Sequence, residues 1–125
     1  MEVNCDGKGI EKTAQIIEKG GIVIFPTDTV YGIGCNPYNE NAVKKIYKIK
    51  SRTKLKSLPV LAYSLDIIKE ITLIDEFTEK IIEKYWPGPL TLILELTDQK
   101  LKKSLNLGNK IAVRIPDSKC TLKLL

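Results

Sequence analysis

The fold class of this chain follows from one stretch, Ile22-Val23-Ile24-Phe25-Pro26-Thr27-Asp28-Thr29-Val30-Tyr31-Gly32-Ile33-Gly34. Its first four residues form a continuous β-prone apolar run, which predicts a strand buried on both faces. Pro26 ends that strand, and residues 27–34 predict a loop rich in hydroxyl groups and glycine. A loop that follows a buried strand lies at the carboxyl end of a sheet, where α/β proteins bind ligands. A tight turn that satisfies its own hydrogen bonds is the alternative interpretation.

Helices are predicted on both sides of this first strand. Apolar residues spaced i, i+4 and i+7 from Ile10 are typical of an amphipathic helix, which Gly20-Gly21 ends by supplying a positive φ. The next helix is capped by Asn39 or Asn41 and continues to Ile49.

The rest of the chain continues the alternation of strands and helices. We expect a strand over 58–63, a short helix over 65–70, a helix capped by Asp75 with Phe77, Ile81, Ile82 and Tyr85 facing inward, a strand over 90–96, a lysine-rich helix over 98–105, a strand over 111–115, and a terminal helix capped by Asp117. Strands that alternate with helices predict an α/β sheet.

Length and composition restrict the class of protein. The chain has 125 residues, enough for one domain, and its 43% hydrophobic and 28% charged residues are ordinary for a globular protein. No apolar run approaches the roughly 20 residues that span a bilayer, and the first residues do not resemble a signal peptide. The chain contains no histidine, which excludes a Ser-His-Asp triad and histidine-based zinc sites.

The three cysteines, Cys5, Cys35 and Cys120, are far apart in the sequence. Without a CxxC pair they do not indicate a zinc or redox motif. We expect three reduced thiols in a cytoplasmic protein.

The basic residues are uneven in kind and in position. Of 20 basic residues, Arg52 and Arg114 are the two arginines. Residues 50–56 place four basic side chains within seven positions, with no acidic residue between them. Such a segment suits a polyphosphate or a nucleic-acid backbone. A solvated helix end whose lysines face the helix dipole is the alternative.

Two further segments carry unusual residues. In Ala112-Val113-Arg114-Ile115-Pro116, a charge lies inside an apolar strand, so Arg114 needs a carboxylate or a phosphate from a ligand or from the protein itself. In Trp86-Pro87-Gly88-Pro89, two prolines around a glycine predict a rigid backbone. We expect Trp86, with its large apolar surface, to pack beneath the site.

Four segments in this order resemble the YrdC-like threonylcarbamoyl-AMP synthases: Phe25–Gly34, Lys50–Arg52, Trp86–Thr91 and Ala112–Pro116. The resemblance implies an α/β fold with a twisted open mixed sheet, flanking helices and a basic concave face. It implies a single YrdC-like domain over residues 1–125 that lacks the last strands of the family, because family members continue into an S-x-N segment with no match here.

The activity that the resemblance implies is L-threonylcarbamoyladenylate synthesis. Such an enzyme condenses L-threonine, bicarbonate and ATP, usually with Mg²⁺, and releases pyrophosphate. Its product supplies a downstream threonylcarbamoyl-transferase complex that modifies tRNA in the cytoplasm.

The resemblance also implies roles for single residues. Thr27 and Arg114 match threonine-binding positions, and Lys50, Arg52 and Lys56 match nucleotide contacts. No residue matches a catalytic acid or base, or a metal ligand, because cationic clamping and alignment supply the acceleration. Leu61 stands where many family members have a histidine.

Two other functions compete with this interpretation. One is a non-catalytic module that binds tRNA or double-stranded RNA through the basic face, which the net charge of +5 permits. Aromatic residues make up 6% of the chain and form no RNA-stacking pattern. The other is a carbamoyl-transfer domain of hydrogenase maturation, which comes with large additional domains.

Overall fold

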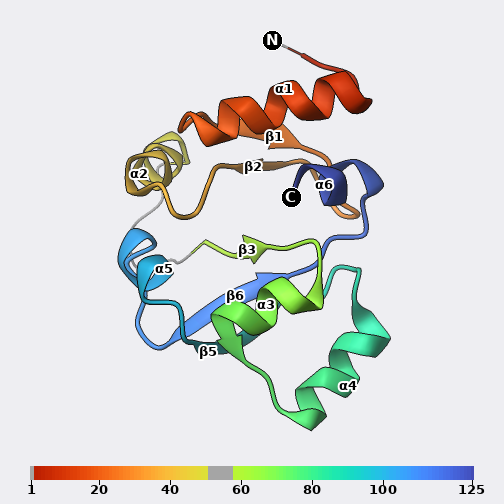
Figure 1. The fold of residues 1–125 in the computed structure, drawn as a ribbon, viewed down its shortest axis with the longest axis vertical. Helices are drawn as coiled ribbons and strands as arrows, with labels where there is room; N and C mark the ends of the chain where they lie inside the picture. The colour runs from red at the N-terminus through yellow and green to blue at the C-terminus, as the bar shows by residue number, and fades with distance from the viewer. Residues whose placement is uncertain (1, 51–57) are drawn as a thin grey trace.

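The computed structural model describes residues 2–50 and 58–125. Figure 1 shows the arrangement of the elements. In chain order they are α1 (Gly7–Glu18), β1 (Val23–Phe25), β2 (Gly32–Gly34), α2 (Glu40–Ile49), β3 (Val60–Leu61), α3 (Leu65–Ile71), β4 (Thr72–Leu73), α4 (Glu76–Tyr85), β5 (Leu92–Leu96), α5 (Gln99–Ser104), β6 (Lys110–Arg114) and α6 (Lys119–Leu124).

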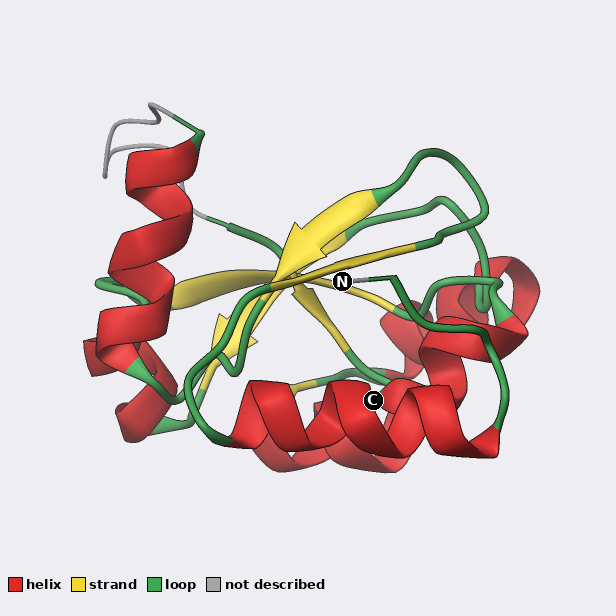
Figure 2. Ribbon diagram, turned by 90° about the horizontal axis from the view of Figure 1, so that it is seen from above, coloured by secondary structure: helices red, strands yellow, loops and turns green. Residues whose placement is uncertain are grey.

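The strands form two sheets. β1 and β2 pair antiparallel, and a four-stranded sheet has the order β3-β6-β5-β4. In that sheet β3 and β6 run parallel, while β5 is antiparallel to both β6 and β4. In Figure 2 the strands cross near the middle of the molecule and helices lie around them. The predicted α/β fold with a mixed sheet and flanking helices is confirmed.

The core is built on one face of β6. Ile111, Val113 and Ile115 are buried, whereas Arg114 between them lies on the opposite face, because successive side chains of a strand alternate. The buried side chains of the helices, among them Ile68 of α3 and Leu101 of α5, belong to the same apolar cluster. Arg114 therefore projects away from the core of its own sheet.

The first strand and its loop differ from expectation. Ile24 is 73% exposed, so the prediction of a strand buried on both faces is wrong: β1 pairs with β2 alone in the described part of the chain. Gly32–Gly34 forms β2 where a loop was expected. The ring of Phe25 occupies the space that side chains at positions 32 and 34 would need. A Cβ atom would lie 2.9 Å from the ring at Gly32 and 2.7 Å from it at Gly34. Glycine at both positions lets this strand pass the ring.

Helix α4 buries only part of the face that was predicted to turn inward: Ile82 is buried and Ile81 half-buried, as expected, but Phe77 and Tyr85 are not. Phe77 and Tyr85 are 73% and 49% exposed, whereas Ile82 and Trp86 are buried. The exposed side chains of Phe77 and Tyr85 therefore lie on another face of the helix than the buried side chain of Ile82. Trp86, just after the helix, is buried as well.

Three of the predicted helix caps can be compared with the structure. The side chains of Asn39 and Asp75 cap α2 and α4, as expected. The prediction that Asp117 caps α6 is wrong: the cap is Ser118, whose hydroxyl oxygen accepts from the backbone N–H of Thr121. Asp117 lies one residue earlier, and its backbone N–H donates to the side chain of Asp28. Among the described helices, none is long and apolar enough to cross a bilayer.

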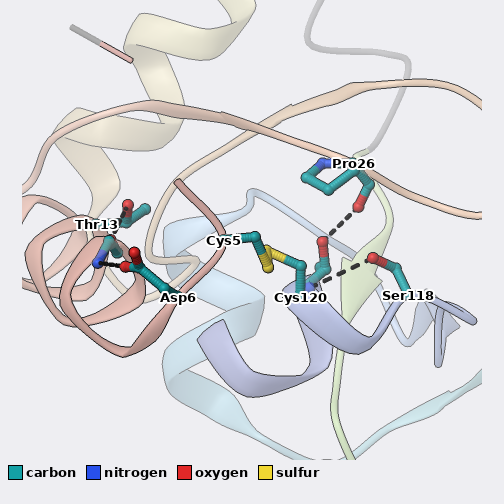
Figure 3. The surroundings of a disulfide bond; sticks show 8 residues. Cys5, Asp6, Thr13, Pro26, Ser118 and Cys120 are labelled. Atoms are coloured by element: carbon teal, nitrogen blue, oxygen red, sulfur yellow. Dashed lines mark hydrogen bonds between the residues drawn. A yellow bond between two sulfur atoms is a disulfide. The ribbon is translucent and has the colours of Figure 1, made fainter. Parts of the chain in front are cut away.

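A disulfide joins Cys5 to Cys120 (Figure 3). The expectation of reduced thiols is wrong for this pair. Packing of α1 on α6 brings together two residues 115 positions apart, with Cα atoms 5.8 Å from each other. Cys35 is free, and burial raises the pKa of its thiol to about 11.

Loss of the disulfide is expected to destabilise the fold. Because the bond closes a loop over most of the chain, Cys120→Ser should lower the free energy of unfolding by about 5 kcal/mol. The measurement is urea unfolding at pH 7 with and without dithiothreitol. The reductant should destabilise the wild type and the Cys35→Ser control, and leave Cys120→Ser unchanged. Equal midpoints for the wild type and Cys120→Ser would show that the bond contributes nothing.

Candidate functional site

Three distant segments meet at the guanidinium of Arg114. Its Nε donates to the carbonyl oxygen of Gly88 at 2.8 Å, and its Nη2 donates to Oδ1 of Asp28. The side chains of Arg114 and Asp28 are 13% and 15% exposed. The loop after β1, the turn after α4 and the end of β6 thus form one site, and the internal salt bridge left open for Arg114 is present.

The turn after α4 is fixed by its own contacts. Trp86 Nε1 donates to the carbonyl oxygen of Leu90 at 2.6 Å, and Gly88 N donates to the carbonyl oxygen of Ile115 at 2.9 Å. A Cβ at Gly88 would lie 2.5 Å from the carbonyl oxygen of Tyr85, so this close approach requires glycine. The turn therefore presents the Gly88 carbonyl at a fixed place beside β6.

The hydroxyl of Thr27 organises the loop after β1. Its Oγ1 accepts from the backbone N–H groups of Thr29 and Val30, both at 3.2 Å, and donates to the carbonyl oxygen of Val30. The tight-turn interpretation therefore describes this hydroxyl correctly. Direct contact with a ligand would require its proton to turn away from Val30.

Asp28 has an exposed backbone but a side chain that turns inward. Its Oδ1 also accepts from Asp117 N at 3.2 Å. Burial, the largest single effect, raises the pKa of Asp28. Hydrogen bonds from two backbone N–H groups and the nearby Arg114 outweigh it and hold this pKa below its ordinary value. The carboxylate is therefore charged at neutral pH, as an ion pair with Arg114 requires.

Sequence reasoning missed two residues of this site, Asp28 and Thr121. The charge of Arg114 signalled a need for a carboxylate, and Asp28 lies inside a segment already singled out. Thr121, which is 1% exposed and follows the disulfide-bonded Cys120 in the chain, donates from Oγ1 to the carbonyl oxygen of Pro26. Figure 3 shows Pro26 and Cys120 in this region. It anchors the loop from the side of α6, and no sequence pattern pointed to it.

The predicted nucleotide residues are placed only in part. Lys50 is the C-cap of α2, and its backbone N–H donates to the carbonyl oxygen of Ile46 at 3.0 Å. Arg52 and Lys56 lie outside the described residues. Leu61, by contrast, is the direct partner of Arg114 in the β3–β6 register. An apolar residue therefore occupies the strand position paired with Arg114.

The described residues contain no group of three His, Cys, Asp or Glu side chains that could hold a metal ion. A cavity of about 210 Å³ is lined by residues of α2 and α5 and the residues just after α5, and it includes none of the three segments around Arg114.

A guanidinium has five N–H groups, and two of those of Arg114 have partners within residues 2–50 and 58–125. The remaining three N–H groups can donate to an anionic oxygen, such as an oxygen of a carboxylate.

Comparison with known proteins shows which family this chain resembles. The family Sua5_yciO_yrdC, described as telomere recombination, matches residues 15–125. The threonylcarbamoyl-AMP synthase of Bacillus subtilis is 34% identical over 128 residues, covering 99% of this chain and 36% of its own length. A putative threonylcarbamoyl-AMP synthase of Methanocaldococcus jannaschii is 38% identical over 115 residues, covering 88% of this chain and 52% of its own.

Solved structures show the same likeness. Sua5 of P. abyssi complexed with L-threonine has a TM-score of 0.84 and 34% identity, over 99% of this chain and 36% of the other. E. coli YciO has a TM-score of 0.87 over 96% of this chain and 59% of the other, and at 23% identity it supports the fold alone. The chain spans between about a third and three fifths of the length of these relatives. On the match over residues 15–125 and these identities, the chain belongs to the Sua5/YciO/YrdC family.

Proposed function

We propose that this chain carries the threonine-binding part of an L-threonylcarbamoyladenylate synthase. The observation that carries the proposal is the guanidinium of Arg114, held where three segments meet. A relative with 34% identity and a TM-score of 0.84 was solved in complex with L-threonine. The chain spans only part of the length of its relatives. The complete reaction is therefore a proposal, and the experiment below tests it on this chain.

In this proposal Arg114 binds the carboxylate of threonine. Two oxygens of a carboxylate match the planar fork of a guanidinium, which a lysine cannot offer. Thr27 lies in the loop that Asp28 connects to Arg114 and contacts the amino acid. Leu61, beside Arg114 in the sheet, makes the wall of the pocket apolar on that side.

Lys50, Arg52 and Lys56 bind the phosphates of ATP, which enters with Mg²⁺. The threonine amine attacks bicarbonate or an activated form of it, and a carbamate forms with loss of water. An oxygen of the carbamate then attacks the α-phosphorus, and pyrophosphate leaves. Alignment of the two anions and neutralisation of developing charge account for most of the acceleration. The product would serve a tRNA-modifying threonylcarbamoyl-transferase complex in the cytoplasm.

The direct test separates binding from turnover. Calorimetry should show that the purified chain binds L-threonine and Mg-ATP. Pyrophosphate release with bicarbonate present then measures whether binding leads to synthesis. Salt-dependent binding of tRNA without binding of threonine or ATP would favour the non-catalytic RNA-binding function instead.

Arg114→Lys tests the role of the guanidinium fork. The charge remains but the two parallel hydrogen bonds to a carboxylate do not, so threonine should bind about tenfold more weakly, equivalent to ~1.4 kcal/mol. The affinity for ATP should not change. Threonine affinity equal to that of the wild type would refute the role given to Arg114.

Arg52→Ala and Lys56→Ala test the nucleotide site. Each substitution removes a cation that the proposal places on a phosphate, so ATP should bind about tenfold more weakly. Threonine affinity in the absence of nucleotide should stay the same. Lys80→Ala, on the exposed side of α4, is the matched control for loss of one positive charge. An equal effect of all three substitutions would indicate general electrostatics rather than specific contacts.

A further inference from the structure

We propose that Asp28 is a positioning residue for Arg114. Its carboxylate fixes the plane of the guanidinium, so that the N–H groups left over point to the carboxylate of the substrate. The inference rests on the proposed threonine site and deepens it. It assigns a function to an acidic side chain that touches the binding arginine rather than the substrate.

The geometry of the guanidinium carries the first step. Arg114 reaches the site from β6 on a long side chain with several rotatable bonds, and a single contact would leave its planar group free to turn. Two acceptors from different segments, Gly88 O on Nε and Asp28 Oδ1 on Nη2, define its plane. Because Nε bonds to backbone and Nη2 to Asp28, Asp28 is the one side chain among the described residues that fixes this plane.

The second step is that Asp28 is itself held in place. Its Oδ1 receives Asp117 N at 3.2 Å in addition to the guanidinium, and its side chain is only 15% exposed. Two residues earlier, the carbonyl oxygen of Pro26 accepts from the buried Thr121. Hydrogen bonds from Asp117 and from Thr121 of α6 thus hold the loop that carries this carboxylate. A carboxylate that is held in place can in turn fix the orientation of the Arg114 guanidinium.

The third step weighs orientation against competition. A carboxylate on Arg114 partly neutralises the charge that attracts a second carboxylate. An arginine that is 13% exposed with no carboxylate partner would, however, be poorly compensated in its surroundings and would lose side-chain freedom when a ligand binds. We therefore expect removal of Asp28 to weaken threonine binding, whereas an inhibitory competitor would strengthen binding when removed.

The first experiment observes the arginine directly. Because the chain has two arginines, its ¹H–¹⁵N spectrum contains two Nε–H signals, and Arg52→Lys identifies the one from Arg114. Rotation about the Cζ–Nη2 bond of this guanidinium, which averages the two Nη2 protons, should speed up at least tenfold in Asp28→Ala, because Asp28 accepts from Nη2. It should change little in Asp28→Asn, whose amide oxygen can still accept from Nη2 and from Asp117 N. A rate of rotation about Cζ–Nη2 in Asp28→Ala equal to that of the wild type would overturn the inference.

The second experiment measures threonine and ATP binding separately by calorimetry. Asp28→Ala should raise the Kd for threonine about tenfold and leave the Kd for ATP unchanged, while Asp28→Asn should stay within about threefold of the wild type. Asp75→Ala is the matched control, because it removes an acidic helix cap far along the chain and should change neither Kd. Thermal unfolding of each variant checks that the loss of affinity is not a loss of folded protein.

The outcomes distinguish the inference from the proposed function. If the wild type binds threonine and Asp28→Ala binds it equally or more tightly, Asp28 does not position Arg114 and the proposed function stands. If the wild type binds no threonine, the proposed function fails and the inference fails with it. If Asp28→Ala does not fold, Asp28→Asn decides: tighter threonine binding in Asp28→Asn would identify Asp28 as a competitor and overturn the inference.

Discussion

The ion pair between Arg114 and Asp28 is the contact on which the site depends. Arg114 lies at the end of an apolar strand, where an unpaired charge would be costly. Its partner comes from a loop 86 positions earlier, between the strands of the other sheet. The pair therefore satisfies a charge and joins the two-stranded sheet to the four-stranded sheet. In the proposed function, the two side chains that join the sheets also form the threonine site.

Strand β6 separates the core from the site by the alternation of its side chains. Ile111, Val113 and Ile115 face the apolar cluster, and Arg114 faces the loop after β1. In the proposed function, a substitution at Arg114 therefore alters threonine binding while the buried face of β6 keeps the fold. The register partner of Arg114 is Leu61, so the strand position paired with Arg114 carries an apolar residue.

Helix α6 brings the two ends of the described chain together. The disulfide from Cys120 holds the segment before α1, Thr121 holds Pro26, and Asp117, just before the helix, holds Asp28. A short helix alone is marginally stable, and these contacts are what attach it to the rest of the molecule. The loop that carries Thr27 and Asp28 is in turn shaped by α6 as much as by β1.

The sequence alone determined what local signals can encode: the α/β class, the cap Asp75, a cap at Asn39 or Asn41, the four family segments and the need of Arg114 for a carboxylate or a phosphate. Periodicity and capping depend on neighbours within a few positions, so they can be recognised without a fold. The tertiary structure decided that the partner of Arg114 is Asp28, that Gly32–Gly34 pairs as a strand, that Phe77 of α4 is exposed, and that Cys5 bonds to Cys120. Each of these depends on which distant surfaces the topology brings together, and the spacing of residues along the chain does not contain that information.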